Sequence, residues 1–250
     1  MGALHDGHLS LVTQAKAHCD KVLVSIFVNP LQFSPNEDYS RYPRPIDLDI
    51  NLLQENAVDA VFTPSTDEIL PQSSSTLVHV PHLGDLWCGH SRPGHFDGVT
   101  SIVARLFHLT TPTHAFFGEK DFQQLRILQK MTQDLFFPIQ IIPCPILREP
   151  DGLAMSSRNQ YLSPGERQLA PALFQTLNLI ADRFHNGELH SETLLNTALK
   201  FLGEKGPFGV DYIGIVDAQT LEPVSLASPS NRILIAAKLG HTRLIDNLAL

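Results

Sequence analysis

Two histidines near the start of the chain have the spacing of a phosphate-binding helix start. His5 and His8 flank Asp6 and Gly7, and a segment with helical spacing, residues 9–18, follows directly. Glycine lets the backbone approach a ligand closely, and a helix N-terminus adds partial positive charge, so the motif suits a triphosphate. The alternative is a pair of surface histidines at a helix start, because this short motif has low specificity by itself.

A charged turn, Gly118-Glu119-Lys120-Asp121, follows a short predicted strand, residues 113–117. A lysine at the carboxyl end of a strand can place a point charge on phosphate. A neighbouring aspartate can hold Mg²⁺ or orient the lysine. The alternative is a solvated charged turn on the surface.

The segment Met155-Ser156-Ser157-Arg158-Asn159 places two hydroxyls and a guanidinium in consecutive positions of a predicted loop. Such a loop can wrap a polyphosphate and stabilise charge as pyrophosphate leaves. An ordinary polar turn has the same composition, so this segment indicates phosphate binding only in combination with the others.

Amides stand among apolar residues in Phe27-Val28-Asn29-Pro30-Leu31-Gln32-Phe33, at the end of a predicted strand. Asn29 and Gln32 can bind the hydroxyl and carboxylate groups of a small polar substrate, while phenylalanines exclude water. Core packing explains the phenylalanines but not Gln32 between them.

The elements that must position these motifs alternate between strand and helix. A mostly parallel sheet covered on both faces is therefore predicted, and its ligands bind at the carboxyl ends of the strands. The predicted strands are residues 21–28, 57–62, 113–117 and 138–142, and the predicted helices are residues 9–18, 46–55, 99–109 and 122–134.

The pattern changes near residue 160. Two helical stretches, residues 164–184 and 191–204, precede predicted strands at 212–216, 222–224 and 232–237. We expect an α/β protein in which a Rossmann-like domain, residues 1–160, carries the phosphate- and substrate-binding motifs, followed by a smaller α+β domain, residues 161–250.

Composition excludes several classes. The chain has 250 residues, 43% of them hydrophobic, and a formal net charge of −8, which argues against a nucleic-acid-binding surface. Three widely spaced cysteines and the absence of a signal peptide or long apolar run favour a cytoplasmic protein that does not bind a membrane. His79, His82 and His90 lack acidic or cysteine partners at ligand spacing, so we expect no metal site of the zinc type.

Taken together and in order, these motifs resemble the pantothenate synthetase family, whose members are AMP-forming pantoate–β-alanine ligases with HIGH-type and KMSKS-type segments. The similarity extends to Arg92-Pro93-Gly94-His95-Phe96, to Phe116–Leu125 and to Arg243-Leu244-Ile245-Asp246-Asn247. The resemblance implies that pantoate attacks the α-phosphate of Mg-ATP, releasing pyrophosphate. The β-alanine amine then attacks the pantoyl adenylate and releases AMP.

The resemblance also implies residue roles. His8 corresponds to a proton donor, and we expect it to act with His5, Lys120 and Arg158 in stabilising charge during the reaction. Gln32 and Gln124 correspond to pantoate-binding positions, with Gln32 also facing β-alanine and Asn29 beside them. The expected ATP-binding residues are Met1, Gly2, Ala3, Leu4, His5, Asp6, Gly7, His8, Gly118, Glu119, Lys120, Asp121, Leu147, Met155, Ser156, Ser157 and Arg158.

The resemblance also implies a homodimer. Members of the family carry a strand and a Pro-Thr pair ahead of the Met-Gly, so we expect this chain to lack the first, central strand. His95 is expected to serve the helix that follows it rather than the ligand. The competing interpretations are a nucleotidyltransferase that stops after placing AMP or CMP on its substrate, and a non-catalytic nucleotide-binding module.

Overall fold

The computed structural model describes residues 2–35 and 37–250. The chain divides by its internal contacts into two compact units. The first comprises Met1–Glu119 and Gln123–Pro145, and the second comprises Lys120–Phe122 and Ile146–Leu250. Residues 146–160, which the sequence analysis placed in the first domain, therefore group with the second unit.

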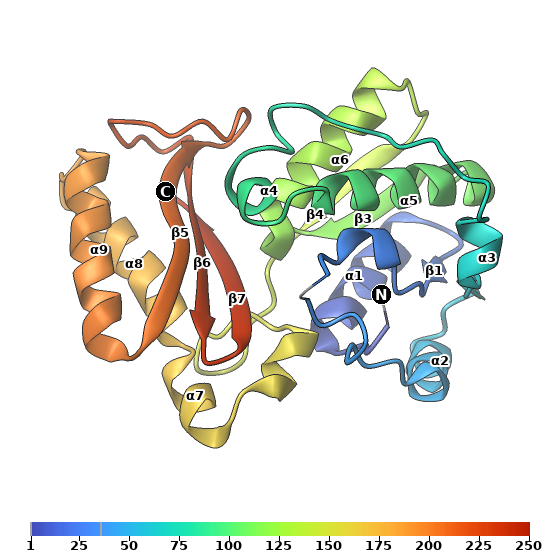
Figure 1. Ribbon diagram of the computed structural model, residues 1–250, viewed down its shortest axis with the longest axis horizontal. Helices are drawn as coiled ribbons and strands as arrows, with labels where there is room; N and C mark the ends of the chain where they lie inside the picture. Colours follow the sequence, from blue (N-terminus) through green and yellow to red (C-terminus); the bar gives the residue numbers. More distant parts are fainter. Residues whose placement is uncertain (1, 36) are drawn as a thin grey trace. The chain divides into compact units, whose positions relative to one another are not determined.

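The first unit is α/β (Figure 1). Helices surround two short parallel ladders, and most helices agree with the sequence prediction. Its elements in chain order are α1 (Asp6–His18), β1 (Leu23–Ser25), the 3-10 helix η1 (Pro30–Gln32), α2 (Ile46–Glu55), β2 (Ala60–Phe62), α3 (Thr66–Ile69), α4 (Trp87–Ser91), α5 (His95–Thr110), β3 (His114–Gly118), α6 (Phe122–Asp134) and β4 (Gln140–Cys144).

The parallel strands form two ladders rather than one sheet. Strand β1 pairs with β2 in parallel, and β3 pairs with β4 in parallel. The strand predicted at residues 21–28 is shorter than expected, because the chain turns into η1 at Pro30 after Ile26 donates a last ladder bond to Phe62 (2.9 Å). The strand predicted at 57–62 is also shorter, because Ala57 adopts a left-handed conformation, φ +50°, after α2.

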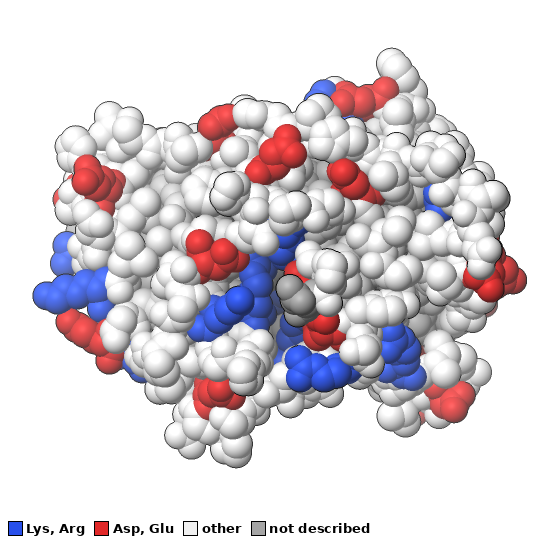
Figure 2. Space-filling view, in the orientation of Figure 1, with Lys and Arg blue, Asp and Glu red and all other residues white. Residues whose placement is uncertain are grey.

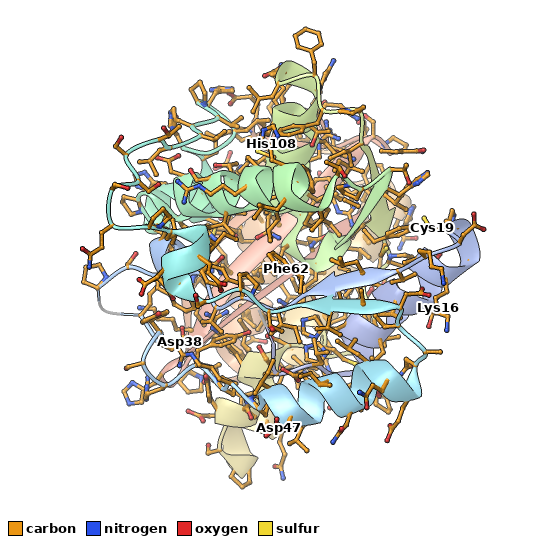
Figure 3. All side chains as sticks on the ribbon, turned by 90° about the vertical axis from the view of Figure 1, so that its right-hand side faces the viewer. Lys16, Cys19, Asp38, Asp47, Phe62 and His108 are labelled. Carbon is orange, nitrogen blue, oxygen red and sulfur yellow. The ribbon has the colours of Figure 1, made fainter. Side chains whose placement is uncertain are left out.

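Helices α1 and α2 share a small core with the first ladder. Val12 of α1, Ile26 after β1 and Leu53 of α2 pack together, and partly buried valines of the ladder lie against them. Lys16 of α1 donates to the carbonyl groups of Asn56 (2.8 Å) and Ala57 (3.3 Å), where α2 ends (Figure 3). A cation at a helix C-terminus satisfies otherwise unpaired carbonyls. This contact fixes α2, which carries Asp47 and Asp49, against α1.

The second unit is an antiparallel sheet with helices α8 and α9 packed on it (Figure 1). The strands lie in the order β5-β6-β7, and a large core cluster lies between the sheet and these helices. The elements are a 3-10 helix η2 (Glu119–Asp121) at the unit border, η3 (Ser157–Tyr161), α7 (Pro164–Leu169), α8 (Ala172–His185), α9 (Ser191–Lys205), β5 (Phe208–Asp217), β6 (Asn231–Leu239) and β7 (Thr242–Ala249).

Three sequence predictions for this unit were wrong. The single helix expected at 164–184 is two helices, because Pro171 has no N–H to donate to the preceding turn and its ring disfavours a continuous helix. The strand expected at 222–224 is only an isolated bridge between Val216 and Pro223. Strand β7 was not predicted as a strand, although all of it pairs with β6.

The core between α8 and the sheet predicts a large effect of one substitution. Leu177 of α8 is fully buried in this cluster. Leu177→Ala should lower the free energy of unfolding by about 2 to 5 kcal/mol, because it removes buried methyl groups and leaves a cavity. Leu199→Ala on α9, where the side chain is 40% exposed, is the matched control and should change it by less than about 1 kcal/mol. Urea denaturation measures both; equal effects would contradict this account of the core.

Candidate functional site

The start of α1 fixes the orientation of the His5 and His8 rings. His5 is the N-cap, and its Nδ1 accepts a hydrogen bond from the Gly7 N–H (3.1 Å). The Nδ1 of His8 accepts from the His5 N–H (3.3 Å), and the two ring centroids lie 4.1 Å apart. A ring nitrogen that accepts a hydrogen bond carries no proton. In this arrangement Nδ1 is the acceptor of each ring, so Nε2 is the ring nitrogen that can act as a donor.

The backbone before α1 is held by a buried carboxylate. Asp49 of α2 is 1% exposed and accepts hydrogen bonds from the N–H groups of Ala3 (2.8 Å) and Leu4 (2.7 Å). Gly2 and Ala3 have left-handed conformations, φ +82° and +51°, and a Cβ on Gly2 would lie 2.9 Å from the Asp49 carboxylate. Successive N–H groups in such a turn converge on an anion. Asp49 therefore sets the path of the segment leading to His5; Met1 lies outside the described residues.

A cavity of about 260 Å³ lies at the carboxyl ends of β1 and β2, where a parallel α/β unit places ligands. Gly2 and Asp49 line it together with the residues that follow each strand, Phe27, Val28 and Thr63 among them. Arg44 also lines it and donates to the carbonyls of Tyr42 (3.0 Å) and Tyr39 (2.9 Å). The cavity thus adjoins the backbone that leads into the histidine motif.

Asn29 and Gln32 are positioned by α5. The Asn29 side chain, 2% exposed, donates to the Gly98 carbonyl (2.9 Å) and to the Gln32 Oε1 (3.3 Å), and it accepts from the Leu31 N–H (3.0 Å). A Cβ on Gly98 would lie 2.4 Å from the Leu31 carbonyl oxygen, so only glycine permits this approach of α5 to η1. The two amides predicted to bind substrate therefore lie together.

Arg92 and His95 hold the backbone of Gln32. The Arg92 guanidinium donates to the Gln32 carbonyl (3.2 Å), and His95 Nδ1 lies 2.7 Å from the same oxygen. His95 is buried in the first turn of α5, and its Nε2 lies 3.0 Å from Arg92. The sequence analysis assigned His95 to the helix that follows; it does begin that helix, but its ring also fixes a predicted substrate residue.

An ion pair ties the segment after η1 to the same arginine. Glu37 accepts from Arg92 at 2.5 and 2.7 Å, and both side chains are largely buried. Burial raises the pKa of the Glu37 carboxyl, but the hydrogen bond and charge of Arg92 outweigh burial and hold this pKa below its ordinary value of 4.5. Glu37 is therefore ionised at neutral pH and keeps Arg92 in place.

The turn after β3 is held by residues of the second unit, whereas β3 itself belongs to the first. Lys120, Asp121 and Phe122 group with the second unit, in which the Asn247 side chain donates to the Lys120 carbonyl (3.0 Å). The Arg232 guanidinium lies 4.0 Å from the Phe122 ring centroid. Lys120 is partly buried, and Asp121 is exposed.

Two adjacent glutamines of α6 have different environments. Gln123 is buried and binds the chain around α4, because its side chain accepts from Cys88 N–H (3.0 Å) and donates to the carbonyls of Leu83 and Leu86 (2.8 Å each). Gln124, the predicted substrate residue, is only partly buried. Gln123 thus serves the fold.

The serine and arginine loop lies in the second unit. Leu147 and Met155 are joined by a bond from the Met155 N–H to the Leu147 carbonyl (3.0 Å), and Ser156 caps η3 by accepting from the Arg158 N–H (3.3 Å). Asn159 donates to the Ala154 carbonyl (3.1 Å). Ser157 and Arg158 lie in η3, both partly buried. Ser157 and Arg158 follow the capping serine directly, so the cap fixes the backbone that carries them.

The predicted site residues thus fall into two groups. The first unit brings together Gly2–His8 and, separately, Asn29 with Gln32, and it also holds Gly118, Glu119 and Gln124. The second unit contains Lys120, Asp121, Leu147 and Met155–Arg158. Sequence reasoning missed Asp49, although the acidic residues of α2 were a signal, and it named Arg92 only as part of the Arg92-Pro93-Gly94-His95-Phe96 segment, without its contact to Gln32.

Metal and membrane features can be stated for the described part of the chain. Residues 2–35 and 37–250 contain no group of three or more His, Cys, Asp or Glu side chains that could hold a metal ion. Within the same residues, no helix is long and apolar enough to cross a bilayer.

A Rossmann-like unit with two histidines at a helix start, followed in the same chain by an antiparallel unit with a serine and arginine loop, is typical of an α/β enzyme that binds a nucleotide. Comparison with known proteins specifies which one. The family model described as pantoate-beta-alanine ligase matches residues 1–249. The chain therefore belongs to the pantoate–β-alanine ligase family, and it is an enzyme of pantothenate biosynthesis.

Individual relatives agree with this family. The pantothenate synthetase of Thermotoga petrophila is 49% identical over 250 residues, which are 100% of this chain and 89% of that protein. The crystal structure of pantothenate synthetase from Thermus thermophilus has a TM-score of 0.97 and 45% identity, covering 100% of this chain and 90% of that one. The pantoate-beta-alanine ligase of Francisella tularensis, complexed with beta-gamma ATP and beta-alanine, has a TM-score of 0.82 and 36% identity, with 100% and 87% covered.

The Glu37–Arg92 pair predicts a pH-dependent contribution to stability. Because the folded-state pKa of Glu37 lies below 4.5, the stabilisation is fully present above that value and is lost as the pH falls through the folded-state pKa. Glu37→Gln should lower the free energy of unfolding at neutral pH by about 1 to 2 kcal/mol. The difference from the unmodified protein should shrink as the pH falls through the lowered pKa of Glu37. Urea denaturation across this range tests it; a difference independent of pH would refute the role of the charge.

Proposed function

We propose that the chain joins pantoate to β-alanine in two ATP-dependent steps at the residues described above. The pantoate carboxylate attacks the α-phosphorus of ATP, forming a pantoyl adenylate and releasing pyrophosphate. The amine of β-alanine then attacks the acyl carbon, the C–O bond to AMP breaks, and the amine loses a proton. The observation that carries this proposal is the pair of imidazoles at the start of α1, whose Nδ1 atoms accept backbone N–H groups and whose Nε2 atoms can donate to phosphate when protonated, since attack by one anion on another needs its repulsion reduced.

The proposed roles follow the chemistry of each side chain. His8 and His5 donate hydrogen bonds to phosphate oxygens through Nε2, and Lys120 and Arg158 supply the positive charge that stabilises pyrophosphate as it leaves. Gln32 and Gln124 bind pantoate, with Gln32 also facing β-alanine and Asn29 holding Gln32 in position. Gly2–His8, Gly118–Asp121, Leu147 and Met155–Arg158 complete the ATP site, with Met1 included on the family resemblance alone.

Mg²⁺ fits this proposal as a companion of ATP. The described residues offer no cluster of acidic and histidine side chains for a dedicated metal cage. Mg²⁺ usually keeps several waters and binds substrate phosphates with only one or two carboxylates from the protein. Asp121, exposed in the turn beside Lys120, is the carboxylate of the phosphate-binding motif that would lie on its coordination sphere. The ion would neutralise phosphate charge there.

The wider setting is also proposed. Residues 1–160 would form the functional ATP- and pantoate-binding domain, although residues 146–160 pack with the second unit. We further propose a homodimer acting in the cytoplasm, on the strength of the family resemblance and the reduced cysteines, of which Cys88 and Cys144 are buried.

An isotope-exchange measurement tests the two-step reaction. Pantoate alone should support exchange of labelled pyrophosphate into ATP, because the adenylate forms reversibly before β-alanine is needed. Rapid net release of AMP should require β-alanine as well. Exchange without pantoate, or AMP release that ignores β-alanine, would exclude the proposed sequence of steps.

Two substitutions of His8 separate its two nitrogens. Asparagine can replace Nδ1 as the acceptor for the His5 N–H but cannot present a donor at the position of Nε2, whereas glutamine extends far enough to do so. His8→Asn should therefore lower kcat by about 10²-fold or more with little change in stability, and His8→Gln should retain more activity. His18→Ala, at the other end of α1, is the matched control. If His8→Asn has normal turnover, His8 is not a transition-state donor.

A further inference from the structure

We propose that Asp246 and Asn247, adjacent residues of β7, are positioning residues that hold the Lys120 turn and the Met155–Arg158 loop in fixed relation to each other. Neither side chain is placed in the ATP site. Each instead binds the support of one phosphate-binding element. The inference rests on the proposed function, because it concerns where Lys120 and Arg158 are held during adenylation.

Asn247 fixes the Lys120 turn. Its side chain is 2% exposed, and its Nδ2 donates to the Lys120 carbonyl at 3.0 Å while its Oδ1 accepts from the Arg232 Nε at 2.7 Å. The same guanidinium stacks on Phe122, two residues after Lys120, at 4.0 Å. The turn is therefore held at its backbone by Asn247 and at its following aromatic ring by Arg232. An amide suits this position because it offers a donor and an acceptor at once.

Asp246 fixes the base of the serine and arginine loop. Its carboxylate is 5% exposed and receives two bonds from the Arg148 guanidinium, at 2.6 and 2.9 Å. Arg148 in turn donates to the Gly152 carbonyl (3.0 Å) and stacks on Phe174 at 3.7 Å. It also pairs with Ala154 in an antiparallel bridge, immediately before Met155. A paired, partly buried guanidinium thus closes the turn from which the loop extends.

The alternating direction of side chains along β7 explains why the neighbouring residues Asp246 and Asn247 can contact two different elements. Successive side chains of β7 point to opposite faces of the sheet. Asp246 and Arg148 lie on the face covered by α8, which carries Phe174. Asn247 shares its face with Arg232, because Arg232 pairs with Ala249 in the ladder, two residues further along β7. The Asp246 carboxylate also accepts from the Asn247 N–H (2.8 Å), so the two anchors are coupled directly.

This arrangement has a kinetic consequence. Lys120 and Arg158 come from distant parts of the sequence, and catalysis by charge stabilisation requires both charges at the positions where charge develops. A displacement of either support should weaken ATP binding and adenylation without removing any group that touches ATP. Loss of packing alone would instead lower the folded fraction and leave the Michaelis constant for ATP unchanged.

The substitution Asn247→Asp tests the proposal. Aspartate keeps the acceptor for Arg232 but replaces the donor to the Lys120 carbonyl by an oxygen that repels it. In the pyrophosphate exchange assay with pantoate, KM for ATP should rise about tenfold, and calorimetry should show a similar loss of ATP affinity. The midpoint of thermal unfolding should change little. Asp211→Asn, which weakens the Arg243–Asp211 pair on the same sheet (2.7 Å), is the matched control and should leave KM for ATP unchanged.

Arg148→Lys tests the contact between Arg148 and Asp246. It also provides a test of the proposal if Asn247→Asp fails to fold. Lysine keeps the charge beside Asp246 but loses the two-pronged contact and the bond to Gly152. KM for ATP should again rise several-fold. Unchanged KM and ATP affinity in both folded variants, or in Arg148→Lys alone when the other does not fold, would overturn the proposal. Absence of pantoate-dependent exchange in the unmodified protein would instead reject the proposed function itself.

Discussion

Hydrogen bonds from side chains to the backbone, made where strands and helices end, are the interaction on which the candidate site depends. Backbone groups at such ends lack partners within their own element and must find them elsewhere. Asp49 binds the N–H groups before α1, Asn29 binds the turn after β1, and Asn247 binds the carbonyl of Lys120. Each bond satisfies a backbone group and in doing so fixes the direction of a neighbouring functional residue.

The same principle determines how an acidic protein can bind an anionic nucleotide. The formal net charge is −8, and on the face shown in Figure 2 acidic side chains occur in several separate groups with basic ones between them. Attraction by the whole molecule therefore contributes little. Local groups must supply the attraction: imidazoles at a helix start, and a few cations such as Lys120 held by backbone contacts.

Sequence reasoning predicted the α/β class, the family and most helices, because these follow from local periodicity and from short motifs. Helices α2 and α6 have the predicted bounds. Its failures share a cause. Strand β7 was missed because the buried polar residues Asp246 and Asn247 interrupt the apolar pattern expected of a strand. Its pairing with β6 is a tertiary feature that a local pattern does not show. Asp49 was missed, and the supporting contact of Arg92 was not predicted, because their backbone partners lie dozens of residues away and no local spacing encodes them.

The grouping of Lys120–Phe122 with the second unit has a consequence for how such a chain can evolve. The polypeptide enters this unit briefly after β3, returns to the first, and enters again at Ile146. A gene fragment encoding only residues 146–250 would leave Asn247 without the Lys120 carbonyl and Arg232 without the Phe122 ring. Residues 146–250 transferred alone into another protein would therefore lose two contacts of their own unit, so we expect such an exchange to cost stability unless Lys120–Phe122 are transferred as well.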